Sequence, residues 1–483
     1  MELFTLPYYS YHLALCILLA LLYHAVLRAA AAAATRRPRS KLPPGPWQLP
    51  IIGSLHHLLR GLPHHIMRDL SLRHGPLMLL RVCEREAIVV SSAEAAREIY
   101  KGNEAAFSAR LSSPGIDELS RHGQGIVFAP YGDHWRLLRR ILMMELLSAW
   151  RVEAFRRIRE EEAARLGSSL QATSDGRLVN IGERLEEFVT DSVVRAIFGD
   201  RLPDRATFLR IVKQGMDLSL IFGLRDLFPS SWLVRLVPRG GGGKAERHRQ
   251  EVFSVMDSIL KSHEERRAAR DGDAEQDMVQ VLLRIQKDAS TRVSLTDGVI
   301  RALLIDVFGA ALDTTATSLQ WVMAELMANP RVMRRVQSEA DCALAGQATV
   351  QEAALKSMQY LRAVIKETLR LHPPAVLFPR MDPKYWNEPD KFMPERFEGE
   401  GVANLRGMDF EFTPFGVGRQ ICPGIDFAYA NLAIALASLL YHFNWELPLG
   451  VEPGEVDMTE EFGVTARRKV NLFVRPIIRV PLG

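Results

Sequence analysis

Residues Phe415–Gly424 read Phe-Gly-Val-Gly-Arg-Gln-Ile-Cys-Pro-Gly, and the apolar run Ile425–Leu440 follows directly. The glycines and the proline exclude a helix or a strand here, so Cys422 lies in a loop just before a helix N-terminus. Unpaired backbone N–H groups and the helix dipole at that place lower the pKa of a thiol. A lone thiolate suits the single axial bond of a haem iron better than zinc, which needs four ligands. This stretch alone leaves a buried loop cysteine open as the alternative.

Length and composition describe a large globular protein. The chain has 483 residues, of which 47% are hydrophobic and 24% are charged, so it can bury a substantial core in one large domain or in two to three smaller ones. The net charge of +4 is too small for a nucleic-acid footprint, and no nucleic-acid partner is expected. The four cysteines have no spacing typical of a disulfide framework or a zinc site, which favours a reducing compartment.

The N-terminal region has the pattern of a membrane anchor. The apolar stretch 11–34 is long enough to span a bilayer as a helix, and basic residues follow it up to Lys41. The positive-inside rule then places the main body in the cytosol. A cleaved signal peptide stays open, although the residues before the apolar stretch are not basic. We divide the chain into an anchor at 1–34, a basic and proline-rich hinge at 35–50 and a main domain at 51–483, the proline-rich part being stiff and extended.

Two short strands and a helix are predicted next. Leu77–Val82 and Ala87–Ser91 have strand patterns, with a turn between them. A helix that begins near Asp133 places Trp135 and Arg139 on one face. An indole N–H and a forked guanidinium together suit a haem propionate, whereas a surface helix with an amphipathic tryptophan is the alternative.

Val299–Met327 predicts a long helix that is apolar nearly all round and runs through the core. Its middle places three small residues, Gly309 to Ala311, shortly before Asp313 and Thr314. A threonine hydroxyl can bond back to the i−4 carbonyl and loosen the helix. We therefore expect a cavity for a diatomic ligand and water, with Asp313 and Thr314 relaying protons. A tight helix-packing patch with satisfied polar groups is the alternative.

A third motif combines charges that are distant in sequence. Glu367 and Arg370 lie on one face of a helix that Pro373 ends, and Arg396 follows in the sequence Pro-Glu-Arg-Phe. An exposed pair of this kind contributes little to stability, but a buried pair needs a further partner, which Arg396 can provide.

Taken in this order, the motifs resemble those of the cytochromes P450, most closely the plant microsomal enzymes of the largest plant clan, over almost the whole chain. The resemblance implies a mainly α fold with a small β portion and a single N-terminal transmembrane helix in the endoplasmic reticulum membrane. It implies haem b with Cys422 as the iron ligand and Thr314 and Asp313 as catalytic residues. The other implied haem contacts are Trp135, Arg139, Arg380, Phe415, Gly416, Gly418 and Gly424. The implied structural triad is Glu367, Arg370 and Arg396, and the implied substrate pocket is Ala310, Val376, Leu377 and Phe462.

The sequence departs from the family pattern in three places. Gln420 stands where an arginine usually reaches a haem propionate, and whether Arg419 next to it substitutes for that arginine stays open. Ala311 replaces a usual glycine and narrows the pocket roof. The chain also passes directly from Arg380 to Met381, where the family has a β-hairpin and a strand of the main sheet. Such a deletion leaves an open sheet edge near the active site and is expected to lower stability and haem loading.

The implied activity is monooxygenation of a lipophilic small molecule, such as a terpenoid or phenylpropanoid, with one oxygen atom from O₂. Electrons would come from NADPH through a cytochrome P450 reductase that docks on the basic face near Arg136 and Arg140. Membrane lipid is the other expected partner. Two alternatives stay open: a non-catalytic or poorly haem-loaded P450-derived membrane protein, and a P450-fold isomerase or dehydratase that needs no reductase.

Overall fold

The computed structural model describes residues 42–110, 116–117, 120, 124–173, 176–199, 202, 204–219, 223–236, 244–269, 277–288, 295–375, 382–399, 403, 405–407 and 409–482. The chain divides into two compact units. Unit 1 consists of Met1–Ala96 and Phe222–Pro238, and unit 2 consists of Arg97–Ile221 and Arg239–Gly483. The predicted membrane anchor and the basic part of the predicted hinge lie outside the described residues.

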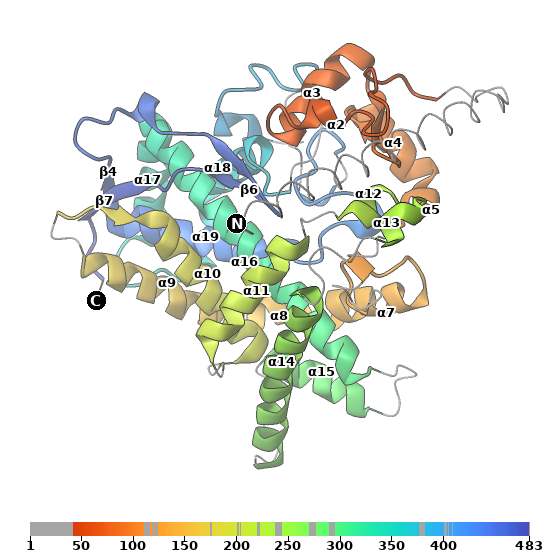
Figure 1. Ribbon diagram of the computed structural model, residues 1–483. Coiled ribbons are helices and arrows are strands. Elements are labelled where there is room, and N and C mark those ends of the chain that lie inside the picture. The colour runs from red at the N-terminus through yellow and green to blue at the C-terminus, as the bar shows by residue number, and fades with distance from the viewer. Residues whose placement is uncertain are drawn as a thin grey trace, which may run out of the picture. The chain divides into compact units, whose positions relative to one another are not determined.

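Unit 1 is built on a two-stranded antiparallel sheet (Figure 1). Strand β1 spans Leu77–Val82, as predicted, and strand β2 spans Arg85–Val90, two residues earlier than predicted. The difference arises because the turn is tight, with Cys83 at a φ of 56°. The helices of the described part of this unit are α2 (Leu55–Leu58), α3 (Pro63–His74), α12 (Leu224–Leu227) and α13 (Trp232–Leu236), and α4 (Ala93–Gly102) crosses the border to unit 2.

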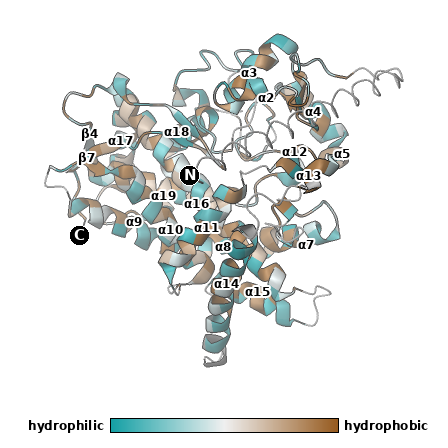
Figure 2. Ribbon diagram, viewed as in Figure 1, coloured by the Kyte–Doolittle hydropathy of each residue, from teal (hydrophilic) through white to brown (hydrophobic). Residues whose placement is uncertain are grey.

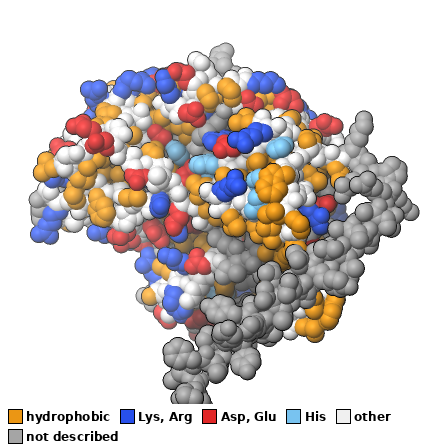
Figure 3. All heavy atoms as spheres, turned by 45° about the horizontal axis from the view of Figure 1, so that its top comes forward, with side chains coloured by type: hydrophobic (Ala, Val, Ile, Leu, Met, Phe, Trp, Pro, Cys, Tyr) orange, Lys and Arg blue, Asp and Glu red, His pale blue; other side chains and the backbone are white. Residues whose placement is uncertain are grey.

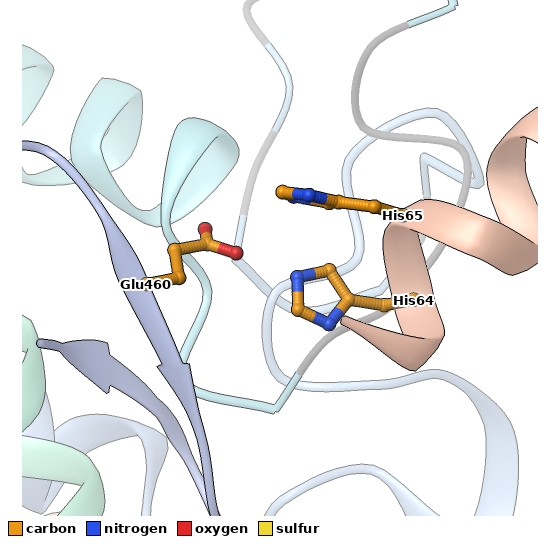
Figure 4. Close-up of side chains that lie close together, drawn as sticks. All are labelled: His64, His65 and Glu460. Atoms are coloured by element: carbon orange, nitrogen blue, oxygen red, sulfur yellow. The ribbon is translucent and has the colours of Figure 1, made fainter. Parts of the chain in front are cut away.

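A small apolar core lies between α3 and the sheet. It contains Leu70, Met78, Leu80 and Val89. Helix α3 starts with Pro63 in its first turn, where a missing N–H costs nothing, and the neighbouring rings of His64 and His65 follow with centroids 4.4 Å apart (Figure 4).

The proline-rich segment of unit 1 lies along strand β1. The Leu79 N–H donates to the Pro44 carbonyl oxygen at 2.8 Å. A Cβ at Gly45 would come within 2.1 Å of the Leu79 carbonyl oxygen, so this approach requires glycine. Residues 42–48 form no helix or strand, in agreement with the extended segment that the prolines predict.

Strand β2 is an edge of this sheet among the described residues. The sheet has two strands there, and Glu86, Ala87 and Ile88 are exposed in succession, Ile88 by 48%. An edge strand of this kind presents unpaired backbone groups among the described residues.

Unit 2 is mainly helical, and Figure 1 shows its helices packed around α16. The α-helices of its described residues are α5 (Glu104–Phe107), α7 (Asp133–Ile141), α8 (Ala149–Ala154), α9 (Arg156–Gln171), α10 (Ile181–Phe198), α11 (Arg205–Ser219), α14 (Lys244–Ala269), α15 (Met278–Lys287), α16 (Asp297–Ala328), α17 (Pro330–Leu344), α18 (Gln359–Leu371) and α19 (Ile425–His442). The shorter helical turns are η1 (Leu142–Leu146), η2 (Glu352–Ser357), η3 (Pro394–Phe397), η4 (Gly418–Gln420) and η5 (Pro453–Glu455). Hydropathy alternates along α9 and α10 in Figure 2, so each turns one apolar side to the core.

Helices α16 and α19 form the centre of unit 2. Helix α16 begins at Asp297 behind Thr296, whose side chain accepts from the Val299 N–H, and packs against α10, α18 and α19. The predicted core helix is thus confirmed, with ends within two residues. Helix α19 is long and apolar enough to cross a membrane, but 78% of its span is buried inside the protein, as befits a core helix.

The strands of unit 2 are short. Strand β7 (Phe473–Ile478) pairs with β3 (Val179–Asn180) on one side and with β4 (Phe443–Glu446) on the other, antiparallel in both cases. Strands β5 (Glu460–Phe462) and β6 (Ala466–Arg468) form a hairpin, with Glu460 of Figure 4 at the start of β5. The mainly helical fold class with small sheets is therefore confirmed.

Charged side chains of both signs are interspersed on the face of the molecule that Figure 3 shows. This distribution agrees with the small net charge.

Candidate functional site

Cys422 lies in the loop between η4 and α19. Gly416 and Gly418 have φ angles of 80° and 66°, in the left-handed region that favours glycine. The Cys422 N–H donates to the Phe415 carbonyl oxygen at 2.9 Å, and the Gly424 N–H donates to the Cys422 sulfur at 3.3 Å. The loop therefore holds the sulfur close to the N-terminus of the core helix α19.

Burial raises the pKa of the Cys422 thiol, although the Gly424 N–H and the Arg139 guanidinium act in the opposite direction. The prediction that the helix N-terminus lowers this pKa is wrong for the thiol by itself, because desolvation of a buried thiolate outweighs one hydrogen bond and one neighbouring charge. A metal ion at the sulfur removes the proton outright. A bound cation, rather than the helix, would therefore stabilise the thiolate form at this position.

Cys422 lines a cavity of about 390 Å³ in unit 2. Ala310, Ala311 and Thr314 of α16 line the same cavity, so the cysteine loop and the small-residue segment of the core helix meet there. Most of the other lining side chains are apolar; they include Ile126, Val127, Leu142, Leu147, Ile197, Val307, Leu369, Pro374, Ala375, Phe415, Phe427 and Leu432.

The two polar residues predicted on α16 face different surroundings. Thr314 lines the cavity, and its hydroxyl donates to the Ala310 carbonyl oxygen at 2.7 Å, the bond to residue i−4 that the sequence predicts. The Asp313 carboxylate accepts a hydrogen bond from the Thr465 hydroxyl at 2.7 Å and does not line the cavity.

Cationic and aromatic groups line the cavity as well. Trp135 and Arg139 of α7 both contribute to it, together with Arg110. Desolvation lowers the pKa of both guanidinium groups. Among the described residues neither Arg110 nor Arg139 forms an ion pair with a carboxylate. Two partly desolvated cations without a protein counter-ion favour an anionic group of a ligand in this cavity.

Gln420 and Arg419 have separate partners. The Gln420 amide donates to the Ser108 carbonyl oxygen at 2.5 Å, two residues before Arg110. The Arg419 guanidinium forms an ion pair with Glu104 at 3.0 Å, also contacts the Tyr131 hydroxyl and does not line the cavity. Arg419 is thus not the substitute for the missing arginine in this structure, and Gln420 holds the segment that carries Arg110.

The lining residues fit a haem. A sulfur ligand, two guanidinium groups with an indole N–H for carboxylates, and small residues beside a threonine all contribute to one cavity, in an otherwise apolar lining. Within the described residues, the groups that would hold the cofactor are therefore Cys422, Trp135, Arg139 and Arg110.

The predicted charge triad comes together behind this site. Glu367 and Arg370 of α18 are fully buried, with two hydrogen bonds of 2.7 and 2.9 Å. Arg396 of η3 donates to the same Glu367 carboxylate at 3.3 Å, and the Met393 N–H donates to it at 2.9 Å. The buried pair thus has the further partner that it needs, which ties η3 to α18.

Asp306 is a lining residue that the sequence analysis did not select. Its carboxylate accepts from the Val127 N–H at 2.9 Å, and burial raises its pKa to about 6. A Cβ at Gly125 would come within 2.2 Å of this carboxylate, so the loop needs glycine to approach it. Asp306 therefore anchors the loop around residue 126 to α16 at the edge of the cavity.

Some predicted site residues are not part of the cavity. Phe462 is 52% exposed on β5 and does not line it, nor does Gly418. The structure thus does not bring Phe462 to the pocket, because β5 turns this side chain to solvent. Val376, Leu377 and Arg380 lie outside the described residues.

Comparison with known proteins agrees with this site. The sequence model of the family described as Cytochrome P450 matches residues 43–382 and 380–472. The two matches meet at the junction after Arg380, where the sequence analysis places a missing segment.

Among curated relatives, desmethyl-deoxy-podophyllotoxin synthase of Sinopodophyllum hexandrum is 39% identical over 505 aligned positions, which cover 98% of each chain. Zealexin A1 synthase of Zea mays is 38% identical, over 92% of this chain and 94% of its own. Premnaspirodiene oxygenase of Hyoscyamus muticus is 38% identical, over 90% and 92%. Since the first alignment has 505 positions and this chain 483 residues, that relative contains residues that this chain lacks.

A solved structure of a zebra fish cytochrome P450 with abiraterone has a TM-score of 0.70 at 22% sequence identity. It covers 86% of this chain and 99% of that chain, which shows a shared fold.

Proposed function

Because this chain belongs to the cytochrome P450 family, we propose that it is a haem-thiolate monooxygenase that inserts one oxygen atom from O₂ into a lipophilic small molecule. The observation that carries the proposal is the single cavity lined by the sulfur of Cys422 and by Thr314 of the core helix. When bound, the haem supplies the reductive cleavage of O₂ and the transfer of one oxygen atom to the substrate.

The protein holds the cofactor at two places. Cys422 would provide the sulfur ligand of the iron, and its loop fixes the sulfur through the hydrogen bond from the Gly424 N–H. Arg139, Trp135 and Arg110 would bind the haem carboxylates, which supply a counter-charge that both guanidinium groups lack among the described residues. Arg110 thereby takes the part of the arginine that Gln420 replaces.

Two residues of α16 handle protons. The Thr314 hydroxyl lies at the cavity wall and donates its proton in a hydrogen bond to the Ala310 carbonyl oxygen. Asp313, which does not line the cavity and accepts a hydrogen bond from Thr465, is the acid that supplies protons. Ala310 and Ala311 leave room for O₂ and water beside Thr314.

The cavity favours an apolar substrate. Its lining includes Ile126, Val307, Leu369 and Ala375, and Asp306 offers one carboxyl for a polar substituent. One relative is named for the oxygenation of premnaspirodiene, and we extend this to a terpenoid or a similar specialised metabolite as the substrate class.

Partners and location follow from the family. The electron donor is an NADPH-dependent cytochrome P450 reductase, and we propose that it docks on the face of α7 where Arg136 and Arg140 are exposed. The apolar stretch 11–34 anchors the chain in the endoplasmic reticulum membrane, with the main body in the cytosol.

Carbon monoxide binding to the reduced protein tests the function. We expect a thiolate-type Soret band in protein expressed with haem supply, and product formation that requires both NADPH and the reductase. Cys422→Ala removes the thiolate-type band, whereas Cys342→Ala, at an exposed cysteine, leaves it unchanged.

A wild-type protein that never shows this band contradicts the proposal and supports the poorly haem-loaded alternative. Turnover of a hydroperoxide without NADPH supports the isomerase or dehydratase instead; the comparisons favour neither.

A further inference from the structure

Thr465 lies in the hairpin turn between β5 and β6 and is 3% exposed. Its hydroxyl oxygen is 2.7 Å from the Asp313 carboxylate and 3.2 Å from the Thr317 hydroxyl. A buried hydroxyl of the C-terminal hairpin thus contacts one α16 side chain at each of its two hydrogen-bonding sides.

The chemistry of the three groups determines which of them donates in each hydrogen bond. An ionised carboxylate only accepts hydrogen bonds, so the Thr465 proton points to Asp313. Thr465 has a single proton, and the Thr317 hydroxyl must therefore donate to Thr465. When Asp313 takes up a proton, both hydrogen bonds can reverse while the heavy atoms stay in place. The same three side chains can therefore remain hydrogen-bonded in both protonation states of the acid.

Backbone contacts at the next residue fix the position of Thr465. The Ala466 N–H donates to the Pro374 carbonyl oxygen at 2.9 Å. The Ala466 carbonyl oxygen accepts from the indole N–H of Trp321, a fully buried residue of α16, also at 2.9 Å. The turn is thereby fastened both to the core helix and to the segment after α18, so the hydroxyl of Thr465 has little freedom to leave Asp313.

We propose that Thr465 is a positioning residue for Asp313: together with Thr317 it holds the carboxylate of the proton-supplying acid in one orientation. This proposal rests on the proposed function. Thr465 does not line the cavity, so it acts through Asp313 and not on the substrate. A hydrogen bond to a charged acceptor is stronger than one between neutral groups, which is why one hydroxyl can determine the orientation of the acid.

The first test compares Thr465→Val with Thr465→Ser. Valine keeps the shape of threonine and loses the hydroxyl, whereas serine keeps the hydroxyl. We expect Thr465→Val to retain the haem signal and to lower the product formed per NADPH consumed by about threefold to tenfold. This loss is smaller than the full rate contribution of a positioned proton donor, because Asp313 itself is still present. Thr465→Ser restores this ratio. The ratio in Thr317→Val falls less, because it loses only the donor to Thr465.

The second test measures thermal unfolding and needs no turnover. Thr465→Val lowers the melting temperature in the wild-type background, and the same change has a smaller effect in the Asp313→Ala background, since the partner is already gone. If Thr465→Val does not fold, Thr317→Val is taken through the same cycle.

The proposal is overturned if Thr465→Val lowers the melting temperature equally in both backgrounds. It is also overturned if Thr465→Ser forms as little product per NADPH as Thr465→Val. Failure of the proposed function looks different: the wild-type protein then shows no thiolate-type Soret band, while the thermal cycle still reports whether Thr465 and Asp313 interact.

Discussion

At the scale of single residues, Asp313 and Thr314 are neighbours on one helix but have different surroundings. Successive residues of an α-helix point about 100° apart, since 3.6 residues make one turn. Thr314 accordingly lines the cavity, while Asp313 contacts Thr465 on another side of α16. In the proposed function, a proton at Asp313 therefore has to reach Thr314 by rotation of the aspartate side chain or through water.

Removing the Thr314 hydroxyl separates haem binding from proton supply. We expect Thr314→Ala to keep its haem content and its carbon monoxide spectrum, because Thr314 contributes no ligand and no charge. Product per NADPH falls by about tenfold and hydrogen peroxide rises, since the cavity has lost its proton-carrying hydroxyl. Thr314→Ser is the control and keeps the wild-type ratio. Equal product per NADPH in Thr314→Ala and the wild-type protein contradicts the role.

Asp306 makes stability depend on pH. Burial raises its pKa from 3.8 to about 6 in the folded protein, so the unfolded chain loses this proton first as the pH rises. The wild-type protein therefore loses stability between about pH 4 and pH 6, by at most about 3 kcal/mol. Asp306→Asn does not titrate and can still accept from the Val127 N–H. Its melting temperature relative to the wild-type protein should rise from pH 4 to pH 7, and a constant difference would argue against the shifted pKa.

The sequence predicted those site residues whose motif is local. Cys422 stands in a glycine-rich loop before an apolar helix, and Trp135 and Arg139 have helical spacing. Asp306 and Thr465 were missed because their partners, Val127 and Asp313, are far away in the chain. An acid within an apolar helix was the one signal for Asp306, and it was used for Asp313 instead.

At the scale of elements, long apolar helices were predicted better than short strands. The ends of α16 lie within two residues of the prediction, because the apolar pattern of the helix and the Thr296 cap are both features of the local sequence. Strand β7 at Phe473–Ile478 has no comparable local signal. Its position depends on pairing with β4, where Glu446 lies opposite Arg475, and no local pattern shows such a partner.

A charge cluster joins η3 to α17 and α18. Glu395 accepts from Arg331 at 2.7 Å, from Arg335 at 3.2 Å and from the Tyr360 hydroxyl at 2.8 Å. The hydrogen bond from Arg331 is the main cause that lowers the Glu395 pKa to about 2, and burial together with Glu395 raises the Tyr360 pKa to about 12. This carboxylate contributes stability that is present above its ordinary pKa of 4.5 and is lost as the pH falls toward 2.

Neutralising Glu395 should weaken this junction. We expect Glu395→Gln to lower the free energy of unfolding at pH 7 by about 1 to 3 kcal/mol. The difference from the wild-type protein narrows in denaturant titrations as the pH falls below 4.5, since the wild-type carboxyl then begins to take up a proton. Glu153→Gln, at an exposed pair with Arg156, is the matched control and should change little. A Glu395→Gln effect as small as the control effect would count against the cluster.

At the scale of the whole molecule, the order of the motifs along the chain was enough to predict the fold class and the family. The same order also revealed the short junction after Arg380, because both flanks match the family closely. How far the protein tolerates this junction depends on the backbone groups and apolar side chains that the missing strand would have covered. Sequence patterns do not report this tolerance, since it is a balance between a lost strand and the remaining packing.

Restoring the missing segment is the strongest test of that balance. We insert the corresponding residues of desmethyl-deoxy-podophyllotoxin synthase between Arg380 and Met381 and expect a higher melting temperature and more haem per protein. The added segment supplies the strand that the junction lacks, and its backbone pairing and apolar burial also reduce aggregation. A glycine-serine insert of the same length is the control, because it lengthens the junction without supplying a strand. If both inserts leave haem content and melting temperature at the wild-type values, the missing strand is not what limits the stability of the shortened chain.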